Sequence, residues 1–161
     1  MGKEIERKWL VPDDFMGYTS KDITLIKQGY IFIGENKHLR IRLSKKLTGN
    51  KAYLCIKYTG KQERDEYEYE IPYSDGVEMY ERCEDKLEKI RYNWEHLFSP
   101  EEVKEIILDE YPTGLKISEV EFPNFEASTT FNFSPFTSWS EVTGNYLYSN
   151  IKFAIGKLVF N

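Results

Sequence analysis

The sequence contains only two cysteines, Cys55 and Cys83, among its 161 residues. Two cysteines are too few for the disulfide framework that holds small secreted domains together, so we expect both to be reduced thiols in a cytoplasmic protein. No segment approaches the roughly 20 consecutive apolar residues of a transmembrane helix. The opening residues MGKEIERKWLV lack the apolar core of a signal peptide. These absences argue against a secreted protein and against a membrane protein.

The sequence also lacks an excess of basic residues, since 22 Lys and Arg stand against 27 Asp and Glu and the formal net charge is −5. This balance argues against a protein that binds long DNA or RNA. P-loop, GxGxxG and GxSxG motifs are absent as well. The two histidines, His38 and His96, are isolated and lack the spacing of zinc ligands. The charge balance does not exclude a local site for a small polyanion.

Short segments of alternating apolar and polar residues dominate the chain, whose length fits one domain over residues 1–161. Many β-branched and aromatic residues indicate that these segments are strands. We expect strands at approximately 3–11, 23–34, 37–45, 51–58, 64–72, 87–96, 104–111 and 114–122. Helices are expected within 74–86 and within 134–142. The pattern predicts a mainly β, α+β fold: a closed eight-stranded antiparallel barrel with helices packed outside.

Charged residues gather on one face of each expected strand. Residues i and i+2 of a strand share a face, so Glu4, Glu6 and Lys8 lie opposite Ile5 and Trp9. The other charged faces hold Arg40, Arg42, Lys57, Arg64, Glu66, Glu68, Glu70, Lys89, Arg91, Asp109, Glu119 and Glu121. On a single strand this pattern is typical of a sheet with one solvated face. Its repetition along the chain favours a barrel whose interior is charged and whose apolar faces are covered from outside.

Charges inside a barrel need partners, because an unpaired buried charge is very costly. Carboxylates suit hard divalent cations such as Mg²⁺ and Mn²⁺, which prefer oxygen ligands. Arginine and lysine suit phosphate. The two sets of side chains together therefore predict a site for a metal-bound oligophosphate.

The segment Glu4-Ile5-Glu6-Arg7-Lys8 fits an ExExK signature, and further motifs follow it in order. They are Gln28-Gly29-Tyr30, Arg40-Ile41-Arg42, Ile56-Lys57, Arg64 with Glu66, Glu68 and Glu70, Lys89-Ile90-Arg91, Asp109, Glu119-Val120-Glu121, Glu141-Val142-Thr143 and Tyr148-Ser149-Asn150. By these motifs the sequence resembles the CYTH superfamily, also called triphosphate tunnel metalloenzymes. The resemblance spans about residues 4–150.

The resemblance implies an eight-stranded tunnel that binds triphosphates together with Mg²⁺ or Mn²⁺. The metal ligands that it implies are Glu4, Glu6, Glu119 and Glu121, with Asp109 as a further ligand. The phosphate-binding residues that it implies are Lys8, Arg40, Arg42, Lys57, Lys89 and Arg91. Arg64, Glu66 and Glu68 would support them. Lys8 and Tyr30 are candidates for deprotonating the attacking water, and lining of the tunnel is an equally good reading of Tyr30.

Hydrolysis of a short triphosphate is the function that this resemblance favours. Tripolyphosphate, ATP and thiamine triphosphate all remain candidate substrates. One alternative is a class IV adenylate cyclase, which needs a nucleoside pocket that no feature of the sequence indicates. Another is a non-catalytic module that binds polyphosphate. We expect a small-molecule partner and neither nucleic acid nor membrane, and the oligomeric state stays open, a homodimer included.

Two segments depart from the family pattern. The connection 92–105 lacks the usual short hairpin with glycine, and its Ser99-Pro100-Glu101-Glu102 suits either a one-turn helix or a hairpin turn. The tail from Ile151 to Asn161 has too little helical periodicity to predict a helix that closes the tunnel. Leu147 replaces a basic residue that is frequent in relatives.

Overall fold

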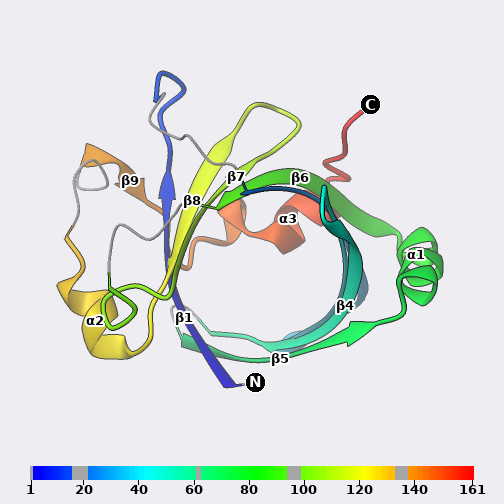
Figure 1. Cartoon of the computed structure of the whole chain (residues 1–161), viewed down its shortest axis with the longest axis horizontal. Coiled ribbons are helices and arrows are strands. Elements are labelled where there is room, and N and C mark those ends of the chain that lie inside the picture. The colour runs from blue at the N-terminus through cyan, green and yellow to red at the C-terminus, as the bar shows by residue number, and fades with distance from the viewer. Residues whose placement is uncertain (1, 16–21, 61–62, 94–98, 133–137) are drawn as a thin grey trace.

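The computed structural model describes residues 2–15, 22–60, 63–93, 99–132 and 138–161 (Figure 1). The strands are β1 (Gly2–Leu10), β2 (Asp22–Ile33), β3 (Lys37–Lys46), β4 (Gly49–Tyr58), β5 (Glu63–Ile71), β6 (Asp85–Asn93), β7 (Glu105–Glu110), β8 (Lys116–Glu121) and β9 (Ser140–Glu141). The helices are α1 (Tyr73–Arg82), α2 (Phe125–Thr130) and α3 (Asn150–Ile155), with a 3-10 turn η2 (Tyr146–Tyr148) before α3. In these ranges no helix combines the length and the apolar character needed to cross a membrane.

Eight antiparallel strands close into a barrel, as the alternation predicted. The order around the barrel is β5-β4-β3-β2-β6-β7-β8-β1, and β1 pairs with β5 to close it (Figure 1). Strand β1 makes the closure because its first half pairs with β5, where Glu4 faces Arg64, and its second half pairs with β8, where Glu6 faces Glu121. Closure leaves no long exposed edge on either of these strands.

Helix α1, predicted within 74–86, covers the outer face of β3 and β4. Its Tyr80 packs in a buried cluster with Ile41, Leu43 and Ala52. The approach is close at Gly76, where a Cβ atom would come within 2.4 Å of the Ala52 Cβ. Glycine therefore allows this helix to lie directly on the barrel wall.

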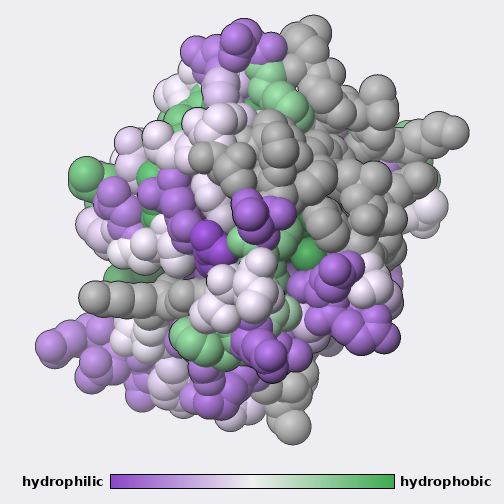
Figure 2. All heavy atoms as spheres, turned by 90° about the vertical axis from the view of Figure 1, so that its left-hand side faces the viewer, coloured by the Kyte–Doolittle hydropathy of each residue, from purple (hydrophilic) through white to green (hydrophobic). Residues whose placement is uncertain are grey.

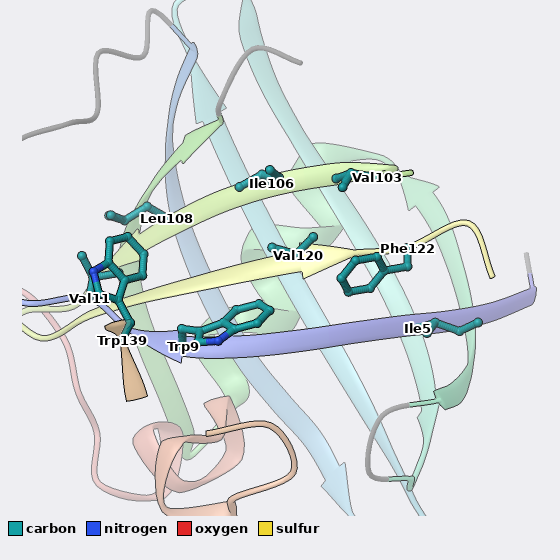
Figure 3. Close-up of a cluster of buried hydrophobic side chains, with 9 residues drawn as sticks. All are labelled: Ile5, Trp9, Val11, Val103, Ile106, Leu108, Val120, Phe122 and Trp139. Carbon is teal, nitrogen blue, oxygen red and sulfur yellow. The ribbon is translucent and has the colours of Figure 1, made fainter. Parts of the chain in front are cut away.

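A second apolar cluster covers the outer face of β1, β7 and β8 (Figure 3). It contains Ile5, Trp9, Val11, Val103, Ile106, Leu108, Val120, Phe122 and Trp139, and Phe131 packs against it just after α2. The molecular surface on the α2 and β9 side is mainly hydrophilic, with small separate apolar patches (Figure 2). The apolar halves of these strands are therefore covered from outside, which leaves their polar halves facing inward.

The helix expected within 134–142 is wrong where the structure describes that segment. Ser140 and Glu141 form β9, which pairs with Leu10 and Trp9 of β1, and residues 134–137 lie outside the described residues. Helix α2 covers this side instead. It begins after Asn124, whose side chain caps the helix by accepting a hydrogen bond from the Ala127 N–H at 2.8 Å.

The structure also describes the turn after Ser99, the two cysteines and the C-terminal tail. Residues 100–102 form a turn in which the Glu102 carboxylate accepts a hydrogen bond from the Ser99 N–H at 3.1 Å. Cys55 and Cys83 are both free thiols, as expected. In the tail, α3 forms where no helix was predicted, and its Ala154 packs among Tyr30, Leu87 and Tyr111.

Those partners of α3 come from the inner faces of β2 and β6 and from the end of β7. In Figure 1, α3 lies within the outline of the ring of strands. The short helix thus fills part of the barrel with apolar side chains and narrows it at that end. Because α3 has only six residues, its helical periodicity is too brief to stand out in the sequence.

Candidate functional site

The barrel encloses a cavity of about 350 Å³ whose walls are mostly charged. The lining residues are Lys3, Glu4, Glu6, Lys8, Tyr30, His38, Arg40, Arg42, Lys57, Arg64, Glu66, Glu68, Arg91, Lys104, Glu105, Ile107, Glu119, Glu121, Ser149, Asn150 and Ile151. Most of the site residues that the sequence indicated are therefore brought together here. Asp109 and Lys89 are not among the lining residues, because both are completely buried behind them.

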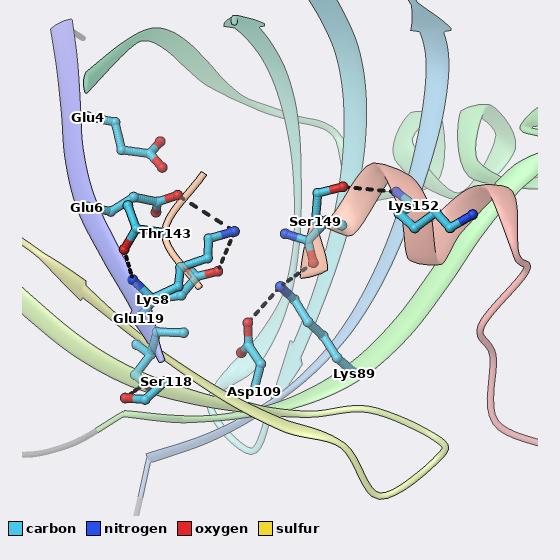
Figure 4. Close-up of polar contacts among 12 residues, drawn as sticks. Glu4, Glu6, Lys8, Lys89, Asp109, Ser118, Glu119, Thr143, Ser149 and Lys152 are labelled. Atoms are coloured by element: carbon cyan, nitrogen blue, oxygen red, sulfur yellow. Dashed lines mark hydrogen bonds and ion pairs between the residues drawn. The ribbon is translucent and has the colours of Figure 1, made fainter. Parts of the chain in front are cut away.

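Four glutamates on β1 and β8 form one wall, which we call the carboxylate wall: Glu4, Glu6, Glu119 and Glu121. The pairing of the two strands places Glu6 opposite Glu121 and Lys8 opposite Glu119. Lys8 Nζ lies 3.3 Å from Glu119 Oε1 and 3.8 Å from Glu6 Oε1 (Figure 4). The pairing of these two strands thus places the four carboxylates along one side of the cavity.

Cations from β4 and β5 neutralise the first two glutamates of this wall. Lys57 Nζ donates to Glu4 Oε1 at 3.0 Å, and Arg64 donates to both Glu4 and Glu6. Burial acts to raise the pKa of Glu4, but the charges of Lys57 and Arg64 outweigh it and hold this pKa well below its usual range. Glu4 is therefore an ionised carboxylate at neutral pH.

Glu119 is ionised for a similar reason. Burial acts to raise its pKa, and the neighbouring Lys8, with help from Lys89 and Arg91, lowers it to about 2. The carboxylate wall thus offers charged oxygen atoms that face an open cavity. Such a donor set fits a hard divalent cation, which would take the place of the ammonium and guanidinium groups now beside it.

The opposite side of the cavity carries arginines that are loosely paired. Arg40 Nη2 lies 3.6 Å from Glu66 and 3.7 Å from Glu68, both beyond good hydrogen-bond length. Within the described ranges its Nε has no hydrogen-bond partner. Burial, together with Arg40 and Arg91, lowers the pKa of Arg42 to about 10. These guanidinium groups repel one another and attract an anion.

Next to the cavity lies a group that we call the sealed cluster: Lys89 and Asp109, which are completely buried, and Arg91, which also lines the cavity. Lys89 Nζ donates to Asp109 Oδ2 at 2.7 Å, and Arg91 donates to both Asp109 oxygens at 2.8 and 2.9 Å. Burial acts to lower the pKa of Lys89, and the adjacent Asp109 carboxylate acts against this and favours the charged ammonium group. Both oxygens of Asp109, a metal ligand implied by the resemblance, are therefore occupied by cations here.

Lys8 and Tyr30, the pair suggested for activating water, line the cavity from different strands. Tyr30 is buried with its ring centroid 5.3 Å from that of His38, and its hydroxyl oxygen accepts a hydrogen bond from Gln28 Nε2 at 3.3 Å. Among the residues that the structure places, no hydrogen bond joins Tyr30 to Lys8. A bound molecule would have to lie between them for both to act on it.

Several lining residues were missed from the sequence. Glu105 faces Glu121 across β7 and β8, and burial raises its pKa. The signal for it was present, because Glu105 shares a strand face with Asp109. His38 was dismissed as isolated, yet it is buried beside Tyr30. Asn150 occurs in a motif that the resemblance quoted, without a role.

Comparison with known proteins extends the resemblance over nearly the whole chain. No family model matches the sequence. The curated inorganic triphosphatase of Acetivibrio thermocellus is 38% identical over 156 residues, which cover 94% of each chain. The crystal structure of the inorganic triphosphatase NE1496 aligns with a TM-score of 0.59 at 24% identity, covering 96% of each chain.

A third similarity concerns the fold alone. The crystal structure of a protein described as a putative adenylate cyclase from Bacillus halodurans aligns with a TM-score of 0.53 at 18% identity. The match covers 81% of this chain and 88% of that one. The same barrel thus occurs in proteins described with different reactions, so the reaction must be argued from the cavity.

Proposed function

The chain belongs to the inorganic triphosphatases of the CYTH superfamily, and from this premise we propose that it hydrolyses a short linear triphosphate inside the barrel with the help of Mg²⁺ or Mn²⁺. The observation that carries the proposal is the cavity itself, where a wall of ionised carboxylates faces loosely paired arginines. A metal-bound triphosphate satisfies both sides at once, since its metal takes carboxylate oxygens and its phosphates take guanidinium groups.

Glu4, Glu6, Glu119 and Glu121 are the metal ligands in this proposal. When bound, Mg²⁺ or Mn²⁺ would neutralise phosphate charge and polarise a P–O bond as a Lewis acid. Asp109 would have to release Lys89 or Arg91 before it could join them, because both of its oxygens already accept their hydrogen bonds. We therefore assign to Asp109 first of all the role of holding these two cations.

The phosphates are held in the proposal by Lys8, Arg40, Arg42, Lys57 and Arg91, which line the cavity, and Lys89 adds its positive charge from behind them. Water attacks the terminal phosphorus in line with the bridging oxygen, that P–O bond breaks, and tripolyphosphate gives pyrophosphate and orthophosphate. Negative charge grows on the leaving oxygen during this step, and fixed guanidinium groups stabilise it without having to reorganise. Glu66 and Glu68 keep Arg40 in place through ion pairs, and Arg64 holds the carboxylates of Glu4 and Glu6 in the same way.

Lys8 and Tyr30 orient the attacking water in this proposal. Lys8 supports the assignment because it lies between Glu6 and Glu119 on the carboxylate wall. Tyr30 supports it because Gln28 donates to its hydroxyl oxygen, which leaves the hydroxyl hydrogen free to point to another acceptor. If Tyr30 only lines the wall, Tyr30→Phe will keep full activity.

A substrate panel tests the proposed reaction. Phosphate release from tripolyphosphate, ATP and thiamine triphosphate is measured with Mg²⁺, with Mn²⁺ and with a chelator. We expect rapid, metal-dependent release from tripolyphosphate and slower release from the two bulkier substrates. Formation of cyclic AMP from ATP would identify a cyclase instead, and tight tripolyphosphate binding without turnover would identify a binding module.

A further inference from the structure

Asn150, the first residue of α3, lies at the cavity and at the sealed cluster at the same time. Its side-chain oxygen accepts a hydrogen bond from Lys89 Nζ at 3.3 Å and another from the Tyr111 hydroxyl at 2.8 Å. A lysine ammonium group can only donate, so the atom that faces it must be Oδ1 of the amide. The amide NH₂ group therefore points elsewhere.

The NH₂ group of Asn150 is a free donor. No described residue accepts a hydrogen bond from Asn150 Nδ2, although Asn150 lines the cavity. Nδ2 is also not among the buried polar atoms that lack a partner, so it is accessible. An accessible donor on the wall of a cavity that attracts anions can hydrogen-bond a ligand there.

Two buried side chains fix the orientation of this amide. Tyr111 is 2% exposed, and its ring centroid lies 4.6 Å from that of Phe153 in α3. Lys89 is held in turn by Asp109. Because a cation donates to the amide oxygen, the amide is polarised and its N–H groups become stronger donors.

The chain that leads to α3 is anchored on the opposite wall, so Asn150 is held at both ends of its segment. The Val142 N–H donates to the Lys8 carbonyl at 2.8 Å, and the Lys8 N–H donates to Thr143 Oγ1 at 3.0 Å (Figure 4). At the other end, Ser149 caps α3 by accepting a hydrogen bond from the Lys152 N–H at 3.2 Å. The position of Asn150 is thus set by the barrel.

We propose that Asn150 is a substrate-binding residue whose NH₂ group donates to a non-bridging oxygen of the bound triphosphate, and that Tyr111 is a positioning residue that holds the amide for this contact. The inference rests on the proposed function in that it needs a triphosphate in the cavity. A neutral donor suits this place. The amide polarised by Lys89 presents a stronger N–H donor to the cavity, while Lys89 itself remains paired with Asp109.

Asn150→Asp is the sharpest test. Its carboxylate can still accept hydrogen bonds from Lys89 and Tyr111, so α3 stays docked, but the NH₂ donor is gone. We expect KM for tripolyphosphate to rise about tenfold or more, the effect of losing a hydrogen bond to a charged group, with a smaller change in kcat. Asn150→Ala should raise KM in the same direction. Unchanged KM in both variants would overturn the proposal, and so would a fall in kcat alone.

Tyr111→Phe tests the positioning role. It keeps the ring and removes the hydroxyl, so KM should rise less than for Asn150→Asp, about threefold for a neutral hydrogen bond. Tyr148→Phe is the matched control, because Tyr148 packs beside the same apolar cluster without a hydroxyl partner among the described residues, and its KM should equal that of the wild type. If Tyr111→Phe equals this control, Tyr111 has no positioning role.

A binding measurement separates this inference from the proposed reaction. Tripolyphosphate is titrated calorimetrically into the wild type and the uncharged variant Asn150→Ala in the presence of a chelator, so that neither turnover nor an added negative charge contributes. Weaker binding by the variant supports the Asn150 contact even if the wild type proves unable to hydrolyse tripolyphosphate, which would refute only the proposed function. Equal binding by the two proteins refutes the contact.

Discussion

The carboxylate wall and the sealed cluster hold the same kinds of charge but pair them differently. In the sealed cluster every ion pair is 2.9 Å or shorter, and the Lys89 and Asp109 side chains are completely buried. At the carboxylate wall Lys57 also pairs closely with Glu4, at 3.0 Å, but Lys8 lies 3.3 Å from Glu119 and 3.8 Å from Glu6, and its side chain is 13% exposed. The completely buried pair of Lys89 and Asp109 is committed to the fold, whereas Lys8 remains available to a ligand.

The difference follows from the cost of burial. A fully buried ion must be compensated by close partners, because its desolvation costs several kcal/mol. Lys8 faces the cavity, keeps some water and tolerates longer contacts. The sealed cluster also carries two cations for one anion, so it adds positive charge behind the place where we propose that the phosphates bind.

The largest expected effect is on stability, from Asp109→Asn. This change leaves Lys89 and Arg91 without their shared anion, so the free energy of unfolding should fall by about 3–5 kcal/mol. The measurement is urea denaturation, with Glu70→Gln as control, because Glu70 makes only an exposed 3.8 Å pair with Lys51. If Asp109→Asn keeps full stability but loses affinity for the metal, Asp109 is a metal ligand, and the contrast between the sealed cluster and the carboxylate wall is wrong.

A smaller effect, on activity, is expected from Arg40→Lys. Lysine keeps the charge but loses the planar guanidinium group that matches phosphate, so kcat/KM should fall roughly 10- to 100-fold, the value of a hydrogen bond or two to a charged group. Melting temperature should change little, because the pairs with Glu66 and Glu68 are long. Steady-state kinetics beside Arg82→Lys, an exposed arginine at the end of α1, provides the check. A large loss of stability would place Arg40 with the sealed cluster.

The smallest effect concerns His38 and the pH dependence of stability. Burial, with Arg40 and Lys57 nearby, lowers the pKa of His38 from 6.5 to about 4. Between these pH values the unfolded chain binds a proton that the folded chain does not, so the free energy of unfolding decreases as pH falls from 6.5 toward 4. Above that window the contribution is fully present.

His38→Gln should flatten this part of the stability curve. The measurement is the urea midpoint of wild type and variant at neutral pH and near the middle of the window. A variant that loses as much stability as the wild type on acidification would show that His38 does not titrate in this way.

The barrel could be predicted from the sequence because the alternation of apolar and polar residues identifies the strands and shows which residues share a face of the sheet. The same rule placed Glu4, Arg40 and Glu119 in one interior. Alternation does not report depth along the barrel, and so it could not separate Asp109, which is sealed, from Glu119, which faces the cavity. Helix α3 could not be predicted because it is short and is stabilised by contacts with distant residues such as Tyr111. The proposed substrate-binding role of Asn150 depends on those contacts, so it could not be predicted from the sequence either.

Hydrolysis of tripolyphosphate by Glu6→Gln, measured beside the wild type and Glu70→Gln over a range of Mn²⁺ concentrations, tests the central claim most directly. The claim is that the carboxylate wall holds the metal. It predicts that Glu6→Gln loses at least about 100-fold in activity, or needs far more Mn²⁺, while its melting temperature stays near that of the wild type and Glu70→Gln behaves normally. Wild-type activity with an unchanged Mn²⁺ requirement in Glu6→Gln would contradict it.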